Sequence, residues 1–437
     1  MPSKVRLSSG NNKTRPEPTS RLSFVPFLLI SSILVVTLAI LSLRALPRLS
    51  LLSNHFFPLT TTTTTTLFSS SSTSFKNSSA MSTYAKELEV AQLAVQRASI
   101  LTKRVFHEKA KGTVDKNDKS PVTIGDFGAQ ALIIAALRHH FPDDEIVAEE
   151  EAAQLRSEPN LRDQIFDLVK TTKLDDAAAE ASLGGGIASA ESMMDIIDQG
   201  NSKGGAAGRI WAIDPIDGTK GFLRGGQYAV CLALMVDGDV KVGVLGCPNL
   251  PVDDKAPLAA DIGSNANDDT GYGVIFSAVL GQGATSRPLR TGAIASDGGS
   301  ISMKPVTDLS AATFCESVEA GHSAHDDQAQ IAAKLGITKP SVRMDSQSKY
   351  GSIARGAGDI YLRLPVKATY QEKIWDHAAG DLILREAGGQ VTDIQGNRLD
   401  FAVGRTLANN KGVIAAPAAV HGEVLKVVQE VLSSKSS

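Results

Sequence analysis

Trp211-Ala-Ile-Asp-Pro-Ile-Asp-Gly-Thr-Lys-Gly-Phe222 holds two aspartates, a proline and a glycine-threonine pair in one short segment. The residues Arg209–Ile213, which overlap the start of this segment, have the apolar character of a buried strand. Asp214 lies where that strand is expected to end. Asp217 follows within the next turn. Ligand sites of α/β proteins lie at the ends of such strands, so the segment is a candidate site.

The residues between and after the aspartates favour a sharp turn into a helix. Pro215 fixes φ across the bend, Gly218 permits a twist that a Cβ would resist, and Thr219 can cap the helix that follows. Carboxylates beside free N–H groups suit a hard cation shared with a phosphate. The alternative is a capped turn with a solvated aspartate pair, and other carboxylates must decide between the two.

The composition excludes several classes of protein. The 437 residues include 44 Lys and Arg against 47 Asp and Glu, so the overall charge favours neither a nucleic-acid nor a membrane-surface partner. The cysteines Cys231, Cys247 and Cys315 are widely spaced, which argues against a disulfide framework or a zinc site. We expect reduced thiols in the core, and the sequence leaves redox regulation through them open.

Residues 1–80 have the composition of a targeting segment. They are rich in Arg, Ser and Thr and contain a single acidic residue, Glu17, which is typical of a chloroplast or mitochondrial transit peptide. Within them, residues 24–43 form an uncharged run of about the 20 residues that span a bilayer, so a membrane anchor is the alternative. A protein started at Met81 would lack both and remain cytoplasmic.

The first part of the folded chain predicts helices followed by strands. Apolar residues recur every three or four positions from Tyr84 to Val105, which indicates a helix. We expect a short extended piece over residues 122–124 and a second helix with Asp126 at its start. A brief strand over residues 146–148 leads directly into the acidic run that begins at Glu149.

The later sequence adds a hairpin and then alternating elements. Asp237-Gly238 lies between two apolar runs and predicts a tight turn between antiparallel strands. From about residue 301 strands and helices alternate, which indicates an α/β layer. We therefore expect an α/β fold with alternating helix and sheet layers, divided into an α+β metal-binding subdomain at 81–300 and an α/β substrate-binding subdomain at 301–437.

Carboxylates recur at the expected strand ends and helix starts. Such positions converge at one edge of an α/β sheet, and a carboxylate cluster repels itself unless cations neutralise it. Oxygen ligands without a histidine or cysteine cluster favour Mg²⁺ over zinc, and about two or three such ions suit phosphate-ester hydrolysis. The residues concerned are Asp126, Glu149, Asp214, Asp217 and Asp376.

These motifs resemble a known family. Glu149-Glu150, Trp211–Thr219 and Trp375-Asp-His-Ala-Ala-Gly380 are similar to the lithium-sensitive, Mg²⁺-dependent phosphatases of the inositol monophosphatase superfamily. Within it, the chain most resembles the 3′(2′),5′-bisphosphate nucleotidases. The segments that carry this closer similarity are Lys119–Asp126, Gly218–Gly225, Gly321–Asp326, Asp345–Tyr350 and Tyr361–Pro365. The resemblance covers nearly the whole folded part and implies a sugar-phosphatase-like fold.

The resemblance also implies roles for individual residues. Asp126 and Thr219 would position and deprotonate the attacking water, and Glu150 would support the metal ligands. The implied metal ligands are Glu149, Asp214, Asp217, Asp376 and the carbonyl of Ile216. The implied substrate-binding residues are Thr219, His322, Ser346, Lys349 and Arg363. Lysine and arginine suit phosphates that lie away from the metals, because they supply a point charge and a planar fork of donors.

The implied reaction is removal of the 3′-phosphate from adenosine 3′,5′-bisphosphate, which gives AMP. The resemblance extends this to 3′-phosphoadenosine 5′-phosphosulfate and inositol 1,4-bisphosphate, and it places the reaction in sulfur metabolism, in a monomer. One alternative is an inositol monophosphatase or another sugar-phosphate phosphatase on the same scaffold. Another is a non-catalytic nucleotide or metal sensor that has kept the fold.

Overall fold

The computed structural model describes residues 83–110, 120–255, 271–319, 324–367 and 369–434. Residues 78–437 make one compact unit. Residues 24–43 lie outside the described part, and within that part none of the helices combines the length and apolar character needed to cross a membrane.

Helices and short strands alternate along the described chain. The α-helices are α1 Ala85–Ala110, α2 Ser120–His140, α3 Ala153–Ser157, α4 Pro159–Thr171, α5 Ala177–Ser182, α6 Ala190–Ile197, α7 Thr219–Arg224, α8 His325–Lys334, α9 Ser348–Ala354, α10 Ala378–Glu386 and α11 Ala418–Ser433. The 3-10 turns are η1 Asp198–Gly200, η2 Leu309–Ala311, η3 Ile374–Asp376 and η4 Phe401–Val403. The strands are β1 Glu145–Ala148, β2 Arg209–Asp217, β3 Ala229–Val236, β4 Asp239–Pro251, β5 Tyr272–Val279, β6 Ala284–Pro288, β7 Gly299–Ile301, β8 Phe314–Glu316, β9 Val342–Arg343, β10 Ile360–Arg363, β11 Gly389–Thr392 and β12 Val413–Pro417.

The larger sheet has seven strands in the order of the chain, from β1 to β7. β1 and β2 are parallel, and each later pair is antiparallel. The expected hairpin joins β3 to β4 through Asp237 and Gly238, which both adopt positive φ, at 51° and 79°. Both residue types tolerate that conformation, so the Asp-Gly pair confirms the predicted turn.

The smaller sheet has five strands in the order β11-β12-β10-β8-β9. Its β10 runs parallel to β8 and antiparallel to β12, so segments far apart in the chain are brought together. The larger sheet ends with β7 at Ile301 and the smaller one begins with β8, so the strands change sheet close to the boundary expected near residue 300. Both sheets nevertheless belong to one compact unit.

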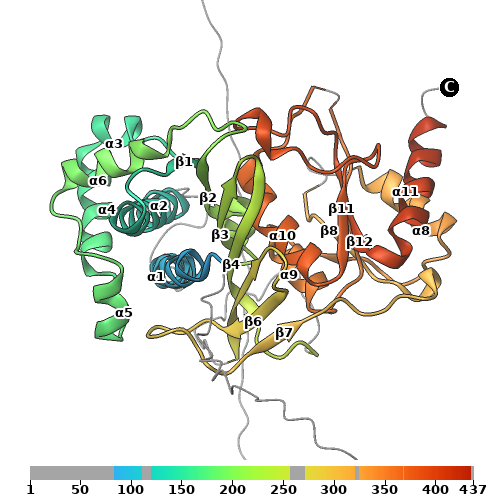
Figure 1. Cartoon of the computed structure of the whole chain (residues 1–437), viewed down its shortest axis with the longest axis horizontal. Helices are drawn as coiled ribbons and strands as arrows, with labels where there is room; N and C mark the ends of the chain where they lie inside the picture. The colour runs from blue at the N-terminus through green and yellow to red at the C-terminus, as the bar shows by residue number, and fades with distance from the viewer. Residues whose placement is uncertain (1–82, 111–119, 256–270, 320–323, 368, 435–437) are drawn as a thin grey trace, which may run out of the picture. The chain divides into compact units, whose positions relative to one another are not determined.

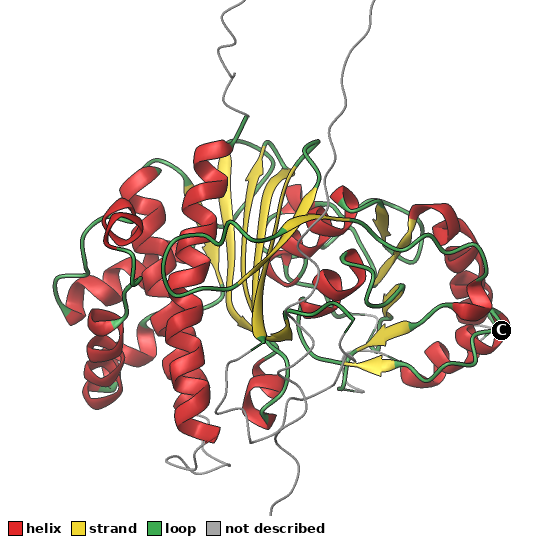
Figure 2. Ribbon diagram, turned by 90° about the horizontal axis from the view of Figure 1, so that it is seen from below, coloured by secondary structure: helices red, strands yellow, loops and turns green. Residues whose placement is uncertain are grey.

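Helices and sheets alternate in layers, which confirms the predicted α/β class. α1 and α2 cover one face of the larger sheet, and α9 and α10 pack between the other face and the smaller sheet. α8 and α11 lie against the outer side of the smaller sheet (Figure 1). Figure 2 shows the long helices on one face of the larger sheet and shorter ones on its opposite face.

Apolar side chains fill the space between the layers. The central strand β3 is buried on both faces of the larger sheet, and this explains why it is apolar throughout rather than alternating. At the start of β2, the indole of the fully buried Trp211 donates to Asp144 Oδ2 at 2.8 Å, and Arg209 pairs with Asp144 Oδ1 at 2.8 Å. These contacts fix the strand that leads to the aspartates of the central segment.

Two local predictions are wrong. α2 begins at Ser120, so residues 122–124 are helical and Asp126 lies in the second turn instead of capping the helix. Pro121, whose fixed φ suits a first helical turn, explains the earlier start. β2 does not end at Asp214 but continues to Asp217, because a register shift between these two residues lets the strand keep its pairing with β3.

Candidate functional site

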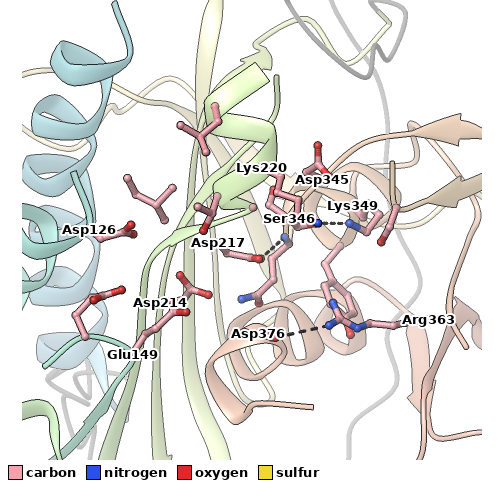
Figure 3. A pocket seen from close by; sticks show the side chains of 18 of the residues that line it. Asp126, Glu149, Asp214, Asp217, Lys220, Asp345, Ser346, Lys349, Arg363 and Asp376 are labelled. Atoms are coloured by element: carbon pink, nitrogen blue, oxygen red, sulfur yellow. Dashed lines mark hydrogen bonds and ion pairs between the residues drawn. The ribbon is translucent and has the colours of Figure 1, made fainter. Parts of the chain in front are cut away.

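A cavity of about 580 Å³ is lined by α2, the ends of β1 and β2, α7, α9, β10 and η3 (Figure 3). Predicted site residues from both parts of the chain line it. They are Asp126, Glu149, Glu150, Asp214, Ile216, Asp217, Thr219, Ser346, Lys349, Arg363 and Asp376. His322 lies outside the described residues, so its predicted role stays a prediction.

Two of the carboxylates are brought together by the register of parallel strands. Ala148 of β1 pairs with Ile213 of β2. Glu149 and Asp214, each one residue further along, are therefore neighbours on adjacent strands at the same edge of the sheet. The sequence predicted that these two carboxylates converge, and the parallel pairing brings them together although Asp214 lies within β2 and not at its end.

The irregular end of β2 positions the next pair of groups. After the register shift, Asp217 still pairs with Ala229 of β3, and Gly218 turns the chain at φ 90°. α7 then begins at Thr219, and Gly218 is its N-cap residue without a side-chain cap. Thr219 was expected to act as the cap. Because it is the first helical residue, its hydroxyl is not used in capping and it lines the cavity.

Asp126 reaches the cavity from α2. The helix can approach β2 closely because residue 125 is glycine, and a Cβ there would lie 2.6 Å from Ile216 Cδ1. Asp126 is buried, and its Oδ1 has no hydrogen-bond partner among the described residues. A buried polar atom without a partner is costly, so this carboxylate is arranged for a ligand.

Asp217 lies at the end of β2 and Asp376 lies in η3, and Gln347 ties the two segments together. The backbone N–H of Gln347 donates to Asp217 Oδ2 at 2.5 Å. Its side-chain amide donates to the carbonyl of Trp375 at 2.8 Å and accepts from the N–H of Gly380 at 3.0 Å. Gln347 thereby fixes the segment around Asp376, at the start of α10, relative to the end of β2.

The carboxylates are electrostatically frustrated. Burial and the charges of Glu150 and Glu149 raise the pKa of Asp126 well above its usual value, and burial beside Glu149 does the same for the pKa of Asp214. Glu149 is exposed to solvent. Even so, desolvation by the groups packed around its carboxylate and the charge of Asp376 raise its pKa to about 8. Each of these groups therefore resists ionisation unless a cation is present.

Asp217 and Asp376 complete the cluster. Burial and the charge of Asp376 raise the pKa of Asp217 to about 6, and burial also raises the pKa of Asp376. Like Asp126, Asp214 has a buried Oδ1 without a hydrogen-bond partner among the described residues. Oxygen donors of this kind, buried and unpaired, fit hard divalent cations such as Mg²⁺ better than they fit a protein counter-charge.

Cationic side chains form the opposite wall of the cavity (Figure 3). Lys349 is buried, and its Nζ donates to the carbonyls of Ser346 at 2.8 Å and Met344 at 3.1 Å. Burial lowers the pKa of Lys349 to about 8. Arg363 reaches the same wall from the end of β10. The cavity thus joins an acidic side, suited to cations, with a basic side, suited to an anion.

Some residues that shape the site were not identified from the sequence. Gln347 lies within the matched segment Asp345–Tyr350, and that match could have drawn attention to it. Arg405 gave no such indication. Its guanidinium donates to the carbonyl of Ala148 at 2.6 Å and lies 4.9 Å from the centre of the Trp375 ring. It thereby joins the segments that carry Glu149 and Asp376, and only the tertiary structure shows this.

The cysteines are free and buried, as the sequence predicted. Burial raises the pKa of Cys231 well above its usual value and the pKa values of Cys247 and Cys315 to about 12. Buried thiols of this kind remain protonated and are poor nucleophiles.

Comparison with known proteins gives consistent matches. The model of the inositol monophosphatase family matches residues 84–433. A 3′(2′),5′-bisphosphate nucleotidase of Emericella nidulans is 67% identical over 350 residues, which cover 80% of this chain and 99% of that protein. A 3′(2′),5′-bisphosphate nucleotidase of Schizosaccharomyces pombe is 48% identical and one of Oryza sativa is 42% identical, covering 80% and 82% of this chain and 97% and 98% of those proteins.

Proposed function

The chain belongs to the inositol monophosphatase family, and from this premise we propose that it removes the 3′-phosphate of adenosine 3′,5′-bisphosphate to give AMP and phosphate. One observation carries the proposal. The unpaired carboxylates and the cationic pair Lys349 and Arg363 face each other across a single cavity. A substrate with two phosphates needs both sides, one for the phosphate that reacts and one for the phosphate that does not.

The family is metal-dependent, and we propose that this chain uses about two or three Mg²⁺ ions. The donors that would hold them are the carboxylates of Glu149, Asp214, Asp217 and Asp376 and the carbonyl of Ile216. Bound there, the ions would polarise the phosphoryl oxygens and lower the pKa of water. The resemblance also implies inhibition by lithium, which a lithium titration of Mg²⁺-supported phosphate release can test.

Asp126 and Thr219 are proposed to position and deprotonate the water that attacks phosphorus. The unpaired Oδ1 of Asp126 can accept a proton, and the Thr219 hydroxyl, free of capping, can orient the same water. As the new P–O bond forms, the bond between phosphorus and the 3′-oxygen breaks, and the 3′-oxygen takes up a proton. Glu150 lines the cavity beside Asp126 and supports this side of it.

The basic wall is proposed to hold the rest of the nucleotide. Lys349 and Arg363 supply charge for the second phosphate, Ser346 supplies a hydroxyl, and His322 is the further contact implied by the resemblance. The same features would admit 3′-phosphoadenosine 5′-phosphosulfate and inositol 1,4-bisphosphate, which also carry two anionic groups. We also propose that the active form is a monomer, which sedimentation of the full-length protein can check.

Rates on two substrates test the proposal. Phosphate release from adenosine 3′,5′-bisphosphate and from inositol 1-phosphate is measured side by side with the full-length protein and MgCl₂. We expect faster turnover of the nucleotide and complete loss of release in EDTA. Faster turnover of the inositol ester would favour an inositol monophosphatase, and nucleotide binding without any release would favour a sensor.

A further inference from the structure

Arg363 lies between two carboxylates of different character. Its Nη2 is 2.7 Å from Glu372 Oε2 and 3.8 Å from Asp376 Oδ2. The shorter contact is a direct ion pair, whereas the longer one exceeds hydrogen-bond distance. The guanidinium is therefore held by Glu372, although a proposed metal ligand lies within reach.

Other contacts hold Glu372 in place. It is buried, and its Oε2 lies 3.3 Å from Nε2 of His377, whose Nδ1 lies 3.0 Å from the hydroxyl of Tyr350. The backbone carbonyl of Glu372 accepts from the N–H of Leu407 at 2.8 Å. Although burial opposes ionisation, Arg363 and His377 lower the pKa of Glu372 to about 2. Glu372 is thus a fixed negative charge.

Glu372 also forms a cluster with Asp376 and His377 in which one atom of each lies within 4.8 Å of the others. Such a group could hold a metal ion. However, the same oxygen of Glu372 already contacts the guanidinium of Arg363 and the ring of His377. A cation there would have to displace Arg363, so the contacts favour a counter-ion for Arg363 over a metal ligand.

We propose that Glu372 is a positioning residue that holds Arg363 away from Asp376. This arrangement leaves Asp376 free for a divalent cation. It also leaves Arg363 Nε, which is buried without a hydrogen-bond partner among the described residues, available to a phosphate oxygen of the substrate. The inference rests on the proposed function for the roles of Asp376 and Arg363.

A neutral residue in place of Glu372 changes the partner of Arg363. In Glu372→Gln the guanidinium loses its counter-ion, and Asp376 is the remaining carboxylate within 4 Å of it among the described residues. Arg363 then pairs with Asp376 and competes with the metal for that carboxylate. Removing Arg363 as well abolishes the competition, so the double variant Glu372→Gln with Arg363→Gln regains metal affinity.

Titration calorimetry with MgCl₂ alone, on the full-length protein without substrate, measures this directly. We expect Glu372→Gln to bind Mg²⁺ about tenfold more weakly, the size typical of losing a residue that orients a metal ligand. The double variant should return to within about twofold of wild type, and Arg363→Gln alone should bind no more weakly than wild type. Glu372→Asp, which keeps the charge, should stay closer to wild type than Glu372→Gln.

Asp381→Asn is the matched control. Asp381 is also fully buried and pairs with arginines, Arg385 at 3.0 Å and Arg398 at 2.8 Å, but it does not line the cavity. Its replacement should lower the melting temperature without changing Mg²⁺ affinity. Equal weakening in Asp381→Asn, wild-type affinity in Glu372→Gln, or a double variant as weak as Glu372→Gln would each overturn the proposal. The last result is the one expected if Glu372 were itself a metal ligand.

Substrate kinetics separate this inference from the proposed function. The substrate-free titration does not depend on which phosphate ester is hydrolysed, so its pattern can hold even if wild type fails to act on adenosine 3′,5′-bisphosphate. On an active substrate at saturating MgCl₂, Glu372→Gln should raise KM more than it lowers kcat, because Arg363 is displaced from the phosphate. A fall in kcat with unchanged KM would contradict the claim that Glu372 positions Arg363 for the substrate phosphate.

Discussion

At the scale of single residues, the site is a set of acids that the protein does not neutralise by itself. Asp126 and Asp214 are buried with unpaired oxygens, and raised pKa values extend through Glu149 and Asp217. Such an arrangement lowers the stability of the protein when no cation is bound, and cation binding restores that stability. Function and stability therefore oppose each other at these positions.

Replacing Asp214 by asparagine should separate the two effects. The amide keeps the shape but removes a ligand, so we expect phosphate release to fall by more than about a hundredfold. The metal-free protein should become more stable, by about 1 kcal/mol or more, because a buried, unpaired carboxyl group is removed. Steady-state kinetics check the fall in phosphate release, and thermal unfolding in EDTA checks the stability of the metal-free protein. Undiminished turnover would contradict the metal mechanism.

The raised carboxyl pKa values also predict how stability depends on pH. Glu149 has an ordinary pKa of 4.5 and a pKa of about 8 in the folded protein. Between these values the folded state holds a proton that the unfolded chain has released. The free energy of unfolding therefore falls as pH rises through this window. Asp217, with a folded pKa of about 6, adds the same slope at the lower end.

Thermal unfolding in EDTA should accordingly give a lower melting temperature at about pH 8 than at about pH 6, the range set by these pKa shifts. Saturating MgCl₂ should remove most of the difference, because the bound cation replaces the protons. Mg²⁺ binding should also release protons, which calorimetry in buffers of different ionisation enthalpy detects. A metal-free protein that is equally stable at both pH values would argue against the frustrated cluster.

At the scale of elements, the end of β2 and the start of α7 set the geometry. The register shift in β2 places Asp214 and Asp217 on one strand, and Gly218 turns the chain so that α7 begins at Thr219. Close packing holds α7 there. Arg224 in its last turn pairs with Asp345 Oδ2 at 2.6 Å, beside the segment that carries the basic wall.

Gly221 in α7 tests how tightly this helix must pack. A Cβ at residue 221 would lie 2.2 Å from the carbonyl oxygen of Gln227 and 2.8 Å from Asp345 Cβ, so Gly221→Ala must displace α7. Thr219 would move with it, and we expect kcat to fall by about a hundredfold, the usual effect of displacing a catalytic group by about 1 Å.

Gly422→Ala is the control for the same substitution. Gly422 lies in α11, where an added Cβ has no atom within 4 Å, so alanine should stabilise the protein by up to about 1 kcal/mol and leave kcat unchanged. Wild-type activity in Gly221→Ala would mean that the position of α7 is not critical.

At the scale of the whole molecule, the site exists because the larger sheet, the helical layer beside it and the end of β10 come together. Metal ligands come from the larger sheet and from the segment before α10, and the basic wall comes from α9 and β10. Arg405 joins these parts by donating to the carbonyl of Ala148 and lying over the ring of Trp375, and Gln347 does so by donating to the Asp217 carboxylate and to the carbonyl of Trp375. No single segment of the chain carries a complete site.

We propose that residues 1–80 direct the protein to a chloroplast or mitochondrion and take no part in the reaction. Every described residue that lines the cavity lies at or after Thr123, so protein started at Met81 should keep kcat/KM within about twofold of the full-length chain. Organelle fractionation of both forms tests where in the cell each one is located. Resistance of the full-length form to carbonate extraction would instead indicate a membrane anchor over residues 24–43.

The sequence predicted much of this architecture because the relevant patterns are local. Apolar periodicity gave α1, and the Asp-Gly pair gave the hairpin between β3 and β4. Local patterns failed where neighbouring elements change the outcome. The end of β2 was placed too early because pairing with β3 carries the strand across a register shift. The start of α2 was placed too late because Asp126 looked like a cap.

The sequence by itself predicted which side chains would line the site, because the carboxylates recur at expected strand ends and helix starts, and the described ones lie at a single cavity. Only the tertiary structure decided how these charges are balanced. Glu372 holds Arg363 from nine positions away in the chain, and Gln347 ties Asp217 to the segment of Asp376. Such pairings depend on distances between segments that the fold brings together, and no local pattern encodes them.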